Sequence, residues 1–302
     1  RLQGDWSSDV CSSDLYMADQ VGALGSIMAF DELQVLYRSD TKRPLSVVSD
    51  RYQVVQPREV LEFYRDLIDI SGYELETAGV LREGRKFWAL AKTGKEASLK
   101  GSDLVKGYLL LATSCDGSLA TTATPTTIRV VCNNTLTMAL QAAQGAIKVP
   151  HRRSFDPQSV KSQLGIAVTQ WDSFMYRMRT LAERKVKSHE VMNYLLQVLC
   201  QPEEGGAPSS RKGLANERAL KRVQALYEGA GHGAELQSAK GTAWGLLNAV
   251  TEFVDHERRA RSSAYRLESA WFGPGASIKQ RALDAALRSE ERRVGKECRS
   301  RW

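Results

Sequence analysis

A run of short β-type segments joined by tight turns constrains the fold of this chain more than any other feature of its sequence. The run is densest over residues 108–140, and an apolar strand is predicted at 105–113. That strand leads into Asp116-Gly117, a dipeptide that favours a hairpin because glycine accepts positive φ. Consecutive strands joined by tight turns form an antiparallel sheet, and its apolar face needs a covering layer of helices. The segment therefore predicts an α+β fold.

The remaining elements of the first half follow from periodicity and from turn residues. Pro57 opens a helix because proline at the first helical position loses no needed N–H group, and Gly72 ends it. Alternating residues after Gly72 predict a strand that returns after a turn at 82–85. Residues 45–48 and 52–55 are expected to form a hairpin or a bent strand. The other expected elements of this half are the strand pair 73–78 and 86–91, a loop at 92–103, and strands 119–124 and 127–131 separated at Pro125. A helix capped by Asn133 or Asn134 is expected to run through 135–140 and to end near Gly145.

The second half is predicted to be almost entirely helical. A stripe that includes Trp171, Phe174 and Met178 recurs at helical spacing and indicates a long amphipathic helix over 157–199. Residues 189–199 either continue this helix or restart it. Glycine, proline and serine over 201–213 indicate a linker. Further helices are expected at 214–227, 241–267 and 277–287.

The sequence divides into two regions and two foreign-looking ends. We expect an α+β core domain at 16–150, with an antiparallel meander sheet packed against helices, followed by a mostly α-helical C-terminal region at 151–288. Residues 1–15 and 289–302 show no helical or strand period and resemble translated sequencing-adapter sequence. They are treated as artefactual extensions and take no part in the fold prediction.

Positive charge is concentrated in the second half of the chain. The formal net charge is +7. Residues 16–147 hold 14 Lys and Arg against 15 Asp and Glu, whereas residues 148–288 hold 22 against 14. This asymmetry favours a surface that faces a polyanion, although a solvated helical exterior accounts for the same counts.

The sequence offers no support for a membrane or secreted protein. No apolar run approaches the roughly 18 residues that cross a bilayer, and no signal-peptide pattern stands at the N-terminus. Cys115, Cys132 and Cys200 are widely spaced in apolar surroundings, which indicates buried thiols in a reducing compartment. We therefore expect a cytoplasmic protein.

Three parts of the sequence resemble the family called domain of unknown function 932, also described as phage/plasmid-like protein. They are SVVSDRYQVVQPREVLEF from Ser46, ATSCDGSLATTATPTTIRVVCNNTL around Cys115, and TAWGLLNAVTEFVDH together with FGPGASIKQRAL near the C-terminus. The resemblance covers nearly all of residues 36–287, and its most distinctive part is the string RVVCNNT at 129–135. It implies carriage on phages, plasmids and integrated elements, with no established activity. The order of elements is also similar to that of single-strand annealing proteins of phage recombination systems, by analogy of fold alone.

Residues that could support catalysis or metal binding are scattered along the chain. Cys132 and His151 could form a thiolate–imidazole pair oriented by Asp116, but no sequence feature brings them together, and a cysteine nucleophile needs an adjacent base. A structural Cys132 at a strand end is the favoured interpretation. The histidines are single, whereas a metal site needs clustered ligands. We predict no catalytic residue, metal or cofactor, and keep as an alternative an enzyme site around Asp116, Cys132 and Asn133.

A basic stretch at the junction of the two regions is the strongest functional candidate. It contains Lys148, His151, Arg152 and Arg153, with no acidic residue among them. Phosphate contacts by such residues are independent of nucleotide sequence and weaken with salt. Three other cations extend the predicted surface, with aromatic residues at 87–88 to stack on bases: Arg85, Lys86 and Arg129. The alternative is that Phe87 or Trp88 belongs to the core and that the charges are merely solvated.

Together these observations predict a non-catalytic nucleic-acid-binding protein. The expected partner is DNA, in the favoured case single-stranded, in recombination or in the maintenance of a mobile element. No membrane partner is expected, and a homo-oligomer is compatible with the sequence. Two alternatives stay open: an enzyme with an unrecognised site, and a structural or interaction protein of a phage or plasmid.

Overall fold

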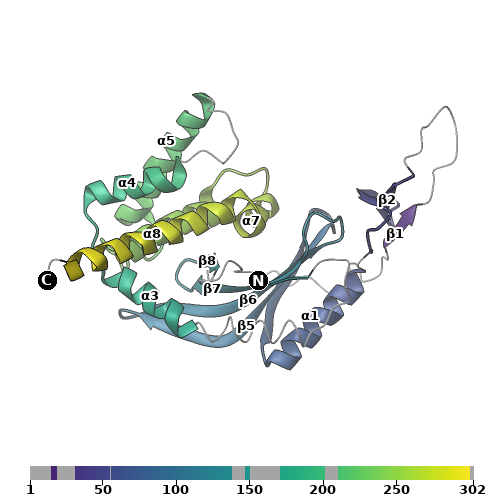
Figure 1. The fold of residues 1–302 in the computed structure, drawn as a ribbon, viewed down its shortest axis with the longest axis horizontal. Helices are drawn as coiled ribbons and strands as arrows, with labels where there is room; N and C mark the ends of the chain where they lie inside the picture. Colours follow the sequence, from purple (N-terminus) through teal and green to yellow (C-terminus); the bar gives the residue numbers. More distant parts are fainter. Residues whose placement is uncertain are drawn as a thin grey trace. The chain divides into compact units, whose positions relative to one another are not determined.

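The chain folds into two antiparallel sheets and a set of helices, so the α+β class predicted from the sequence is confirmed (Figure 1). This fold is seen in a computed structural model that describes residues 15–18, 31–54, 56–137, 147–149, 171–200 and 210–299. The strands are β1 (Leu15–Ala18), β2 (Leu33–Arg38), β3 (Pro44–Ser49), β4 (Glu74–Leu81), β5 (Lys86–Leu99), β6 (Asp103–Ser114), β7 (Thr121–Arg129), β8 (Asn134–Thr137) and β9 (Ile147–Val149). The helices are α1 (Pro57–Ser71), α3 (Trp171–Glu183), α4 (Ser188–Leu199), α5 (Ser210–Ala225), α6 (Ala243–Glu252), α7 (Ser263–Phe272) and α8 (Pro274–Arg299), with the π-helical segments η1 (Leu226–Ala230) and η2 (Phe253–Glu257).

β1, β2 and β3 form a small antiparallel sheet in that order. The hairpin predicted between 45–48 and 52–55 is wrong, because β3 pairs with β2 instead, with Val35 opposite Val47. β2 was not predicted from the sequence, because its apolar residues do not alternate with polar ones. Val35 and Leu36 are adjacent and both apolar, yet Val35 is exposed and Leu36 is fully buried.

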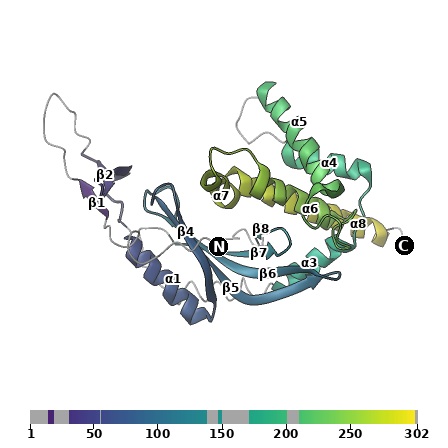
Figure 2. The ribbon, with the colours of Figure 1, turned by 180° about the vertical axis from the view of Figure 1, so that it is seen from behind.

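α1 begins and ends where the sequence predicts. Pro57 occupies its first position, and the Gln56 N–H donates to the Glu59 side chain at 3.1 Å, which stabilises the first turn. Gly72 ends the helix with φ at 69°, a left-handed conformation that glycine adopts without strain. Figure 2 shows α1 beside β4. Its buried face packs on inward residues of the large sheet: Ala89, Ala91, Leu109, Leu111 and Ala123.

The large sheet has the order β4-β5-β6-β7-β8, with β9 paired to β7. The strand pair predicted at 73–78 and 86–91 is confirmed as β4 and β5. The loop predicted at 92–103 is wrong, because β5 continues to Leu99. The last part of β5 alternates exposed polar side chains, such as Glu96, with apolar side chains that face the core. Its polar face made this segment resemble a loop.

β7 runs unbroken through Pro125, where a break was predicted. On one edge β7 pairs with β9 as far as Ala123 and with β8 from Thr126 onward. Pro125 lies between these two paired segments, so its missing N–H removes no ladder hydrogen bond on that edge. Proline is therefore tolerated inside this strand.

The segment after β7 turns back as a strand instead of starting a helix. The helix predicted at 135–140 is wrong, because Thr135 and its neighbours pair with β7 in β8. Asn133 has a φ of 53°, a left-handed conformation that asparagine adopts more readily than most residues. The asparagines that suggested a helix cap therefore make a tight turn. Residues 138–146 lie outside the described part of the chain.

The fold comprises two compact units that interleave along the sequence. Unit 1 comprises residues 1–94, 108–125 and 142–169, and unit 2 comprises residues 95–107, 126–141 and 170–302. Each of the long strands β5, β6 and β7 contributes one part to each unit. The units therefore differ from the division near residue 150 that the composition suggested.

Helix α6 lies at the centre of unit 2. All 10 of its residues are buried, as expected for a helix with neighbours on every side, and it contacts α3, α8 and β8 (Figure 2). The predicted apolar stripe of α3 faces this core and includes Trp171, Phe174, Met175, Met178 and Leu181. Of the two alternatives for residues 189–199, the restarted helix is confirmed, because residues 184–187 separate α3 from α4.

Two more predicted helices differ from the observed ones at their ends. The helix predicted at 241–267 is interrupted at 258–262, between η2 and α7. The segment 277–287 is helical as predicted, within the longer α8. The linker predicted at 201–213 is helical from Ser210 onward, and residues 201–209 lie outside the described part.

Candidate nucleic-acid interface

The basic stretch predicted as the interface falls almost wholly outside the described residues. Lys148 belongs to β9, whose backbone pairs with β7, but its side chain is not described. His151, Arg152 and Arg153 lie in the undescribed range 150–170. Their role in nucleic-acid binding stays a prediction.

Arg85 and Lys86 stand at the start of β5, beside the core of unit 1. Arg85 is half-buried and donates from Nη2 to the Pro44 carbonyl oxygen at 3.4 Å. Lys86 is buried. Phe87 is also buried, in a cluster with Leu36. The burial of Phe87 agrees with the alternative that Phe87 or Trp88 belongs to the core, whereas the buried Lys86 does not fit a merely solvated charge.

Arg129 is buried in unit 2, although the sequence analysis expected it on a surface. Its Nε donates to Asp103 Oδ1 at 2.7 Å, and the two side chains are 3% and 0% exposed. The other oxygen, Asp103 Oδ2, accepts from Ser238 Oγ at 2.5 Å and from Trp244 Nε1 at 2.9 Å. A buried ion is stable only with such a set of partners. Arg129 therefore holds β6, β7 and the α6 region together and does not face solvent.

A second buried ion pair, Lys279 and Asp255, connects β8 to the helices of unit 2 through hydrogen bonds to Thr135. Lys279 Nζ donates to Asp255 Oδ1 and to Thr135 Oγ1, both at 2.7 Å. The Thr135 N–H donates to Asp255 Oδ2 at 2.7 Å, and Trp271 Nε1 donates to Thr135 Oγ1 at 3.3 Å. Burial lowers the pKa of Lys279, while the Asp255 carboxylate opposes that effect. The cluster supplies hydrogen-bond partners to the N–H and hydroxyl groups of Thr135. No local sequence pattern indicates that Thr135 has this structural role.

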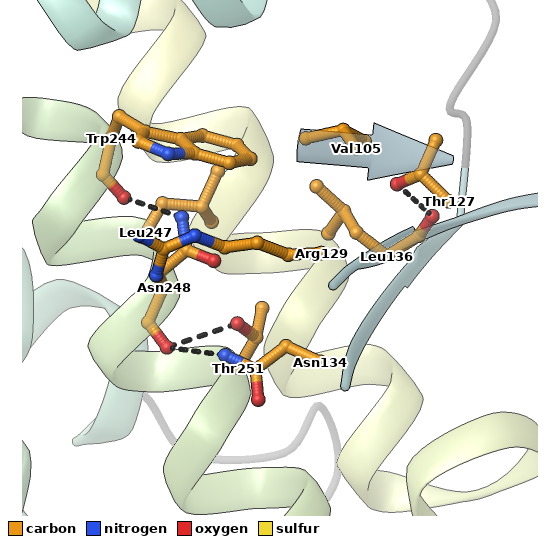
Figure 3. A pocket seen from close by; sticks show the side chains of 9 residues that line it. All are labelled: Val105, Thr127, Arg129, Asn134, Leu136, Trp244, Leu247, Asn248 and Thr251. Atoms are coloured by element: carbon orange, nitrogen blue, oxygen red, sulfur yellow. Dashed lines mark hydrogen bonds between the residues drawn. The ribbon is translucent and has the colours of Figure 1, made fainter. Parts of the chain in front are cut away.

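The string at 129–135 that dominates the family resemblance is thus a structural connection. Asn134 Nδ2 donates to the Asn248 carbonyl oxygen at 3.3 Å. Figure 3 shows both side chains with Arg129 and Trp244 around a cavity of about 10 Å³. That volume admits roughly one water molecule, so the cavity is too small for a substrate.

The alternative enzyme site around Asp116, Cys132 and Asn133 gains no geometric support. Asp116 belongs to unit 1, where its Oδ1 accepts from the Ser118 N–H at 3.0 Å in a local turn. Cys132 belongs to unit 2, and burial raises the pKa of its thiol to about 11, although Arg129 opposes this shift. A cysteine nucleophile reacts as the thiolate, which this environment disfavours.

His232 is an exposed imidazole that a buried carboxylate orients. Its Nδ1 lies 2.6 Å from Glu252 Oε1, and its side chain is 75% exposed while that of Glu252 is 4% exposed. The hydrogen bond to Glu252 raises the pKa of His232. Arg129 holds the same loop through the carbonyl oxygens of His232 and Gly233, at 3.4 and 3.1 Å. The pair therefore fixes a glycine-rich loop against α6.

The most promising exposed cationic surface is the turn at residues 258–262, between η2 and α7, which we call the arginine turn. Arg258 anchors it, because Nη1 donates to Ser269 Oγ at 2.8 Å and the carbonyl oxygen accepts from Arg266 Nε at 3.0 Å. Arg259 and Arg261 are exposed. The Arg261 guanidinium lies 6.0 Å from the centre of the Tyr265 ring, which is 41% exposed.

The carboxylates next to the arginine turn are bound by other cations. Glu257, which precedes the turn, accepts from Arg222 Nε and Nη2, each at 2.5 Å. Asp255 is the partner of Lys279. Glu257 and Asp255 are therefore each paired with a cation that lies outside the turn.

The arginine turn was not predicted from the sequence, although the spacing of its arginines could have indicated it. Three arginines occur within four residues at 258–261, and Tyr265 follows Arg261 at helical spacing. The apolar periodicity of 241–267 led to the prediction of one helix that included these arginines. The helix is interrupted after η2, and Arg259 and Arg261 are exposed in that interruption.

Two other types of site are absent from the described residues. No group of three or more His, Cys, Asp or Glu side chains in the part of the chain that the structure describes is arranged to hold a metal ion. Among the described helices, none combines the length and apolarity that crossing a membrane requires.

Comparison of the sequence with known protein families identifies the family of this chain. The model of the family described as Domain of unknown function (DUF932) matches residues 44–271, and the chain belongs to this family. Neither the curated proteins nor the solved structures contain a significant match. The family resemblance drawn from the sequence is therefore confirmed.

Proposed function

We propose that this protein binds nucleic acid, preferentially single-stranded DNA, through the arginine turn. The observation that carries the proposal is that one short segment holds two exposed arginines, Arg259 and Arg261, and the exposed ring of Tyr265, with the Arg261 guanidinium 6.0 Å from the ring centre. Arginine side chains contact phosphates without regard to sequence, and an aromatic ring stacks on a base. Both contacts are available on one short segment.

The exposed aromatic ring favours a single strand over a duplex. A tyrosine can stack on a base only when that base has left its neighbours, as it does readily in single-stranded DNA. A duplex would meet the arginines alone. Binding of single strands suits a role in recombination or in the maintenance of a mobile element, and we place the protein in the cytoplasm. The basic stretch around Arg152 and Arg153 lies outside the described residues, and its phosphate contacts stay a separate prediction.

The proposal is tested by equilibrium binding of a labelled oligothymidylate at several salt concentrations, starting near about 50 mM. We expect the double variant Arg259→Gln/Arg261→Gln to bind about tenfold more weakly, with a flatter dependence on salt because two phosphate contacts are lost. Tyr265→Ala should weaken binding about fivefold, whereas Tyr265→Phe keeps the ring and should bind like the original protein.

The matched control is Lys100→Gln/Lys221→Gln, which removes two exposed positive charges of unit 2 from a hairpin and from α5. It should change binding little. Equal losses in the control and in the arginine variant would show that net charge alone governs binding. Absence of binding by the original protein near about 50 mM salt would refute the proposed function.

A further inference from the structure

A second basic surface lies in unit 2, at the opposite end of the α6–η2 helix from the arginine turn. It consists of Lys185, Lys187 and Lys240, which are all exposed, and we call it the lysine corner. Lys185 and Lys187 belong to the extended segment between α3 and α4, where alternate residues point to the same side. Lys240 precedes the first turn of α6.

Main-chain hydrogen bonds hold the two segments of the lysine corner together. The Val186 N–H donates to the Gly241 carbonyl oxygen at 3.1 Å, and the Ala243 N–H donates to the Arg184 carbonyl oxygen at 2.9 Å. Lys185 Nζ itself lies 2.7 Å from the Lys240 carbonyl oxygen. The fold therefore brings together the segments that carry Lys185 and Lys240, although these residues are 55 positions apart in sequence.

The acids around the lysine corner leave it positively charged. The Glu190 carboxylate accepts from Arg184 Nη2 at 3.0 Å and from the Lys187 N–H at 2.9 Å, which lowers the pKa of Glu190. Glu183 is exposed at the end of α3 and offsets one lysine.

The length of the connecting helix sets the distance between the two basic surfaces. α6 and η2 form one continuous helix from Ala243 to Glu257, since the residues at their junction keep right-handed helical angles. At 1.5 Å per residue this helix is about 20 Å long. A stacked strand rises about 3.4 Å per nucleotide along its axis, so a strand that reaches both ends of this buried helix needs at least about six nucleotides.

We infer that the lysine corner is a second contact for the same strand, so that tight binding requires a strand of at least about six nucleotides. This inference rests on the proposed function and adds the minimum length of the ligand and the residues that read it. The arginine turn supplies base stacking and phosphate contact, and the lysine corner supplies phosphate contact only. A shorter strand reaches one surface at a time.

The test compares oligothymidylates of about four and about twelve nucleotides on the full chain. We expect Lys185→Gln/Lys240→Gln to weaken binding of the longer strand about fivefold and to reduce the salt slope by about one unit. The same variant should weaken binding of the shorter strand much less, because that strand cannot use both surfaces at once, whereas Arg259→Gln/Arg261→Gln should weaken binding of both strands. Lys100→Gln/Lys221→Gln again serves as the control, and thermal unfolding verifies that each variant is folded.

Three results would overturn the inference. Unchanged affinity and salt slope for the longer strand in the lysine variant would remove the second contact while leaving the proposed function intact. Equal weakening for both lengths would place the lysines in the same local site as Arg259 and Arg261. No binding of either strand by the original protein would refute the proposed function itself, and the inference with it.

Discussion

At the scale of single residues, the ion pair of Arg129 and Asp103 is buried and costly to break. Removing a charge from water costs several kcal/mol unless partners replace the lost hydration. Here Asp103 accepts from Arg129, Ser238 and Trp244, so every one of these groups depends on the others. The pair therefore acts as a structural centre of unit 2, and its effect should appear in stability.

We expect Arg129→Met to lower the free energy of unfolding by about 3–5 kcal/mol, because it leaves the Asp103 carboxylate buried without its cation. Chemical denaturation measures the change. The control is Arg58→Met, which removes an exposed Arg–Glu pair on α1 and should cost less than about 1 kcal/mol. The double variant Arg129→Met/Asp103→Asn should recover part of the loss. A loss as small as that of the control would show that Arg129 is dispensable for folding.

His232 should make stability depend on pH. The hydrogen bond to Glu252 raises the pKa of His232, and Glu257 and Glu235 add to that shift against a small effect of burial. The protonated imidazole is thus favoured in the folded state. Its contribution is fully present below the ordinary histidine pKa of about 6.5 and is lost as the pH rises through the higher folded value.

This dependence is measured as the difference in unfolding free energy between the original protein and His232→Ala. The difference should be larger at about pH 6 than at about pH 9. Glu252→Gln removes the carboxylate that raises the pKa, so it should flatten the same profile. A difference that grows with rising pH would contradict the assignment of the partner.

At the scale of elements, the ends of α1 show how turn chemistry sets a boundary. Gly72 has a φ of 69°, and a Cβ atom added there would meet no other atom within 4 Å. Gly72→Ala therefore tests backbone strain alone, without a steric clash. We expect a loss of about 1 kcal/mol in the free energy of unfolding, with Gly72→Asn costing less because asparagine tolerates this conformation. Equal costs for Ala and Asn in thermal unfolding would argue against the left-handed cap.

β8 shows the opposite case, in which partners from other elements decide the local structure. The sequence after Asn133 favoured a helix, yet Thr135 bonds to Asp255 and Lys279 and lies in a strand. These partners are more than 100 residues away along the chain. No window of local sequence contains them, so periodicity and capping rules could not identify the strand.

At the scale of the whole molecule, the strands β5, β6 and β7 contribute to both compact units. Loss of these strands removes part of each unit, so we expect the two units to unfold together. Cys115 and Cys132 report on this, since Cys115 belongs to unit 1 and Cys132 to unit 2. Both are buried, and burial raises their thiol pKa values, to about 12 and about 11.

We expect both thiols to react with iodoacetamide over the same range of urea concentration, with site-resolved mass spectrometry as the measurement. Cys200 is only partly buried and should react at lower denaturant concentration, which gives an internal control. Reaction of Cys132 well before Cys115 would show that unit 2 opens independently. Such a result would separate the two units energetically.

The charge distribution of the candidate interface was predictable from composition, whereas the exposure of its individual arginines was not. Composition indicated that positive charge gathers in the second half, and the arginine turn and the lysine corner both lie there. Which arginines face solvent was not predictable, because Arg129 and Arg259 look alike in sequence. Their difference comes from Asp103, which binds Arg129 in the interior, and from the helix interruption that exposes Arg259.

The sequence by itself determined the features that depend on neighbouring residues. Pro57 and Gly72 bound α1, alternation marked β4 and the start of β5, and the stripe from Trp171 marked the buried face of α3. The family string at 129–135 was also visible. Each of these signals acts within one turn or one pair of strands, where the chain itself supplies the partners.

Only the tertiary structure decided the features whose partners come from distant segments. It made Asn134 part of a strand, carried β7 through Pro125, buried Arg129 and brought Lys185 next to Lys240. The physical reason is the same in each case. A main-chain N–H, a buried charge or an exposed side chain takes its free energy from the groups that surround it in space, and here those groups are supplied by the packing of the sheet and the helices.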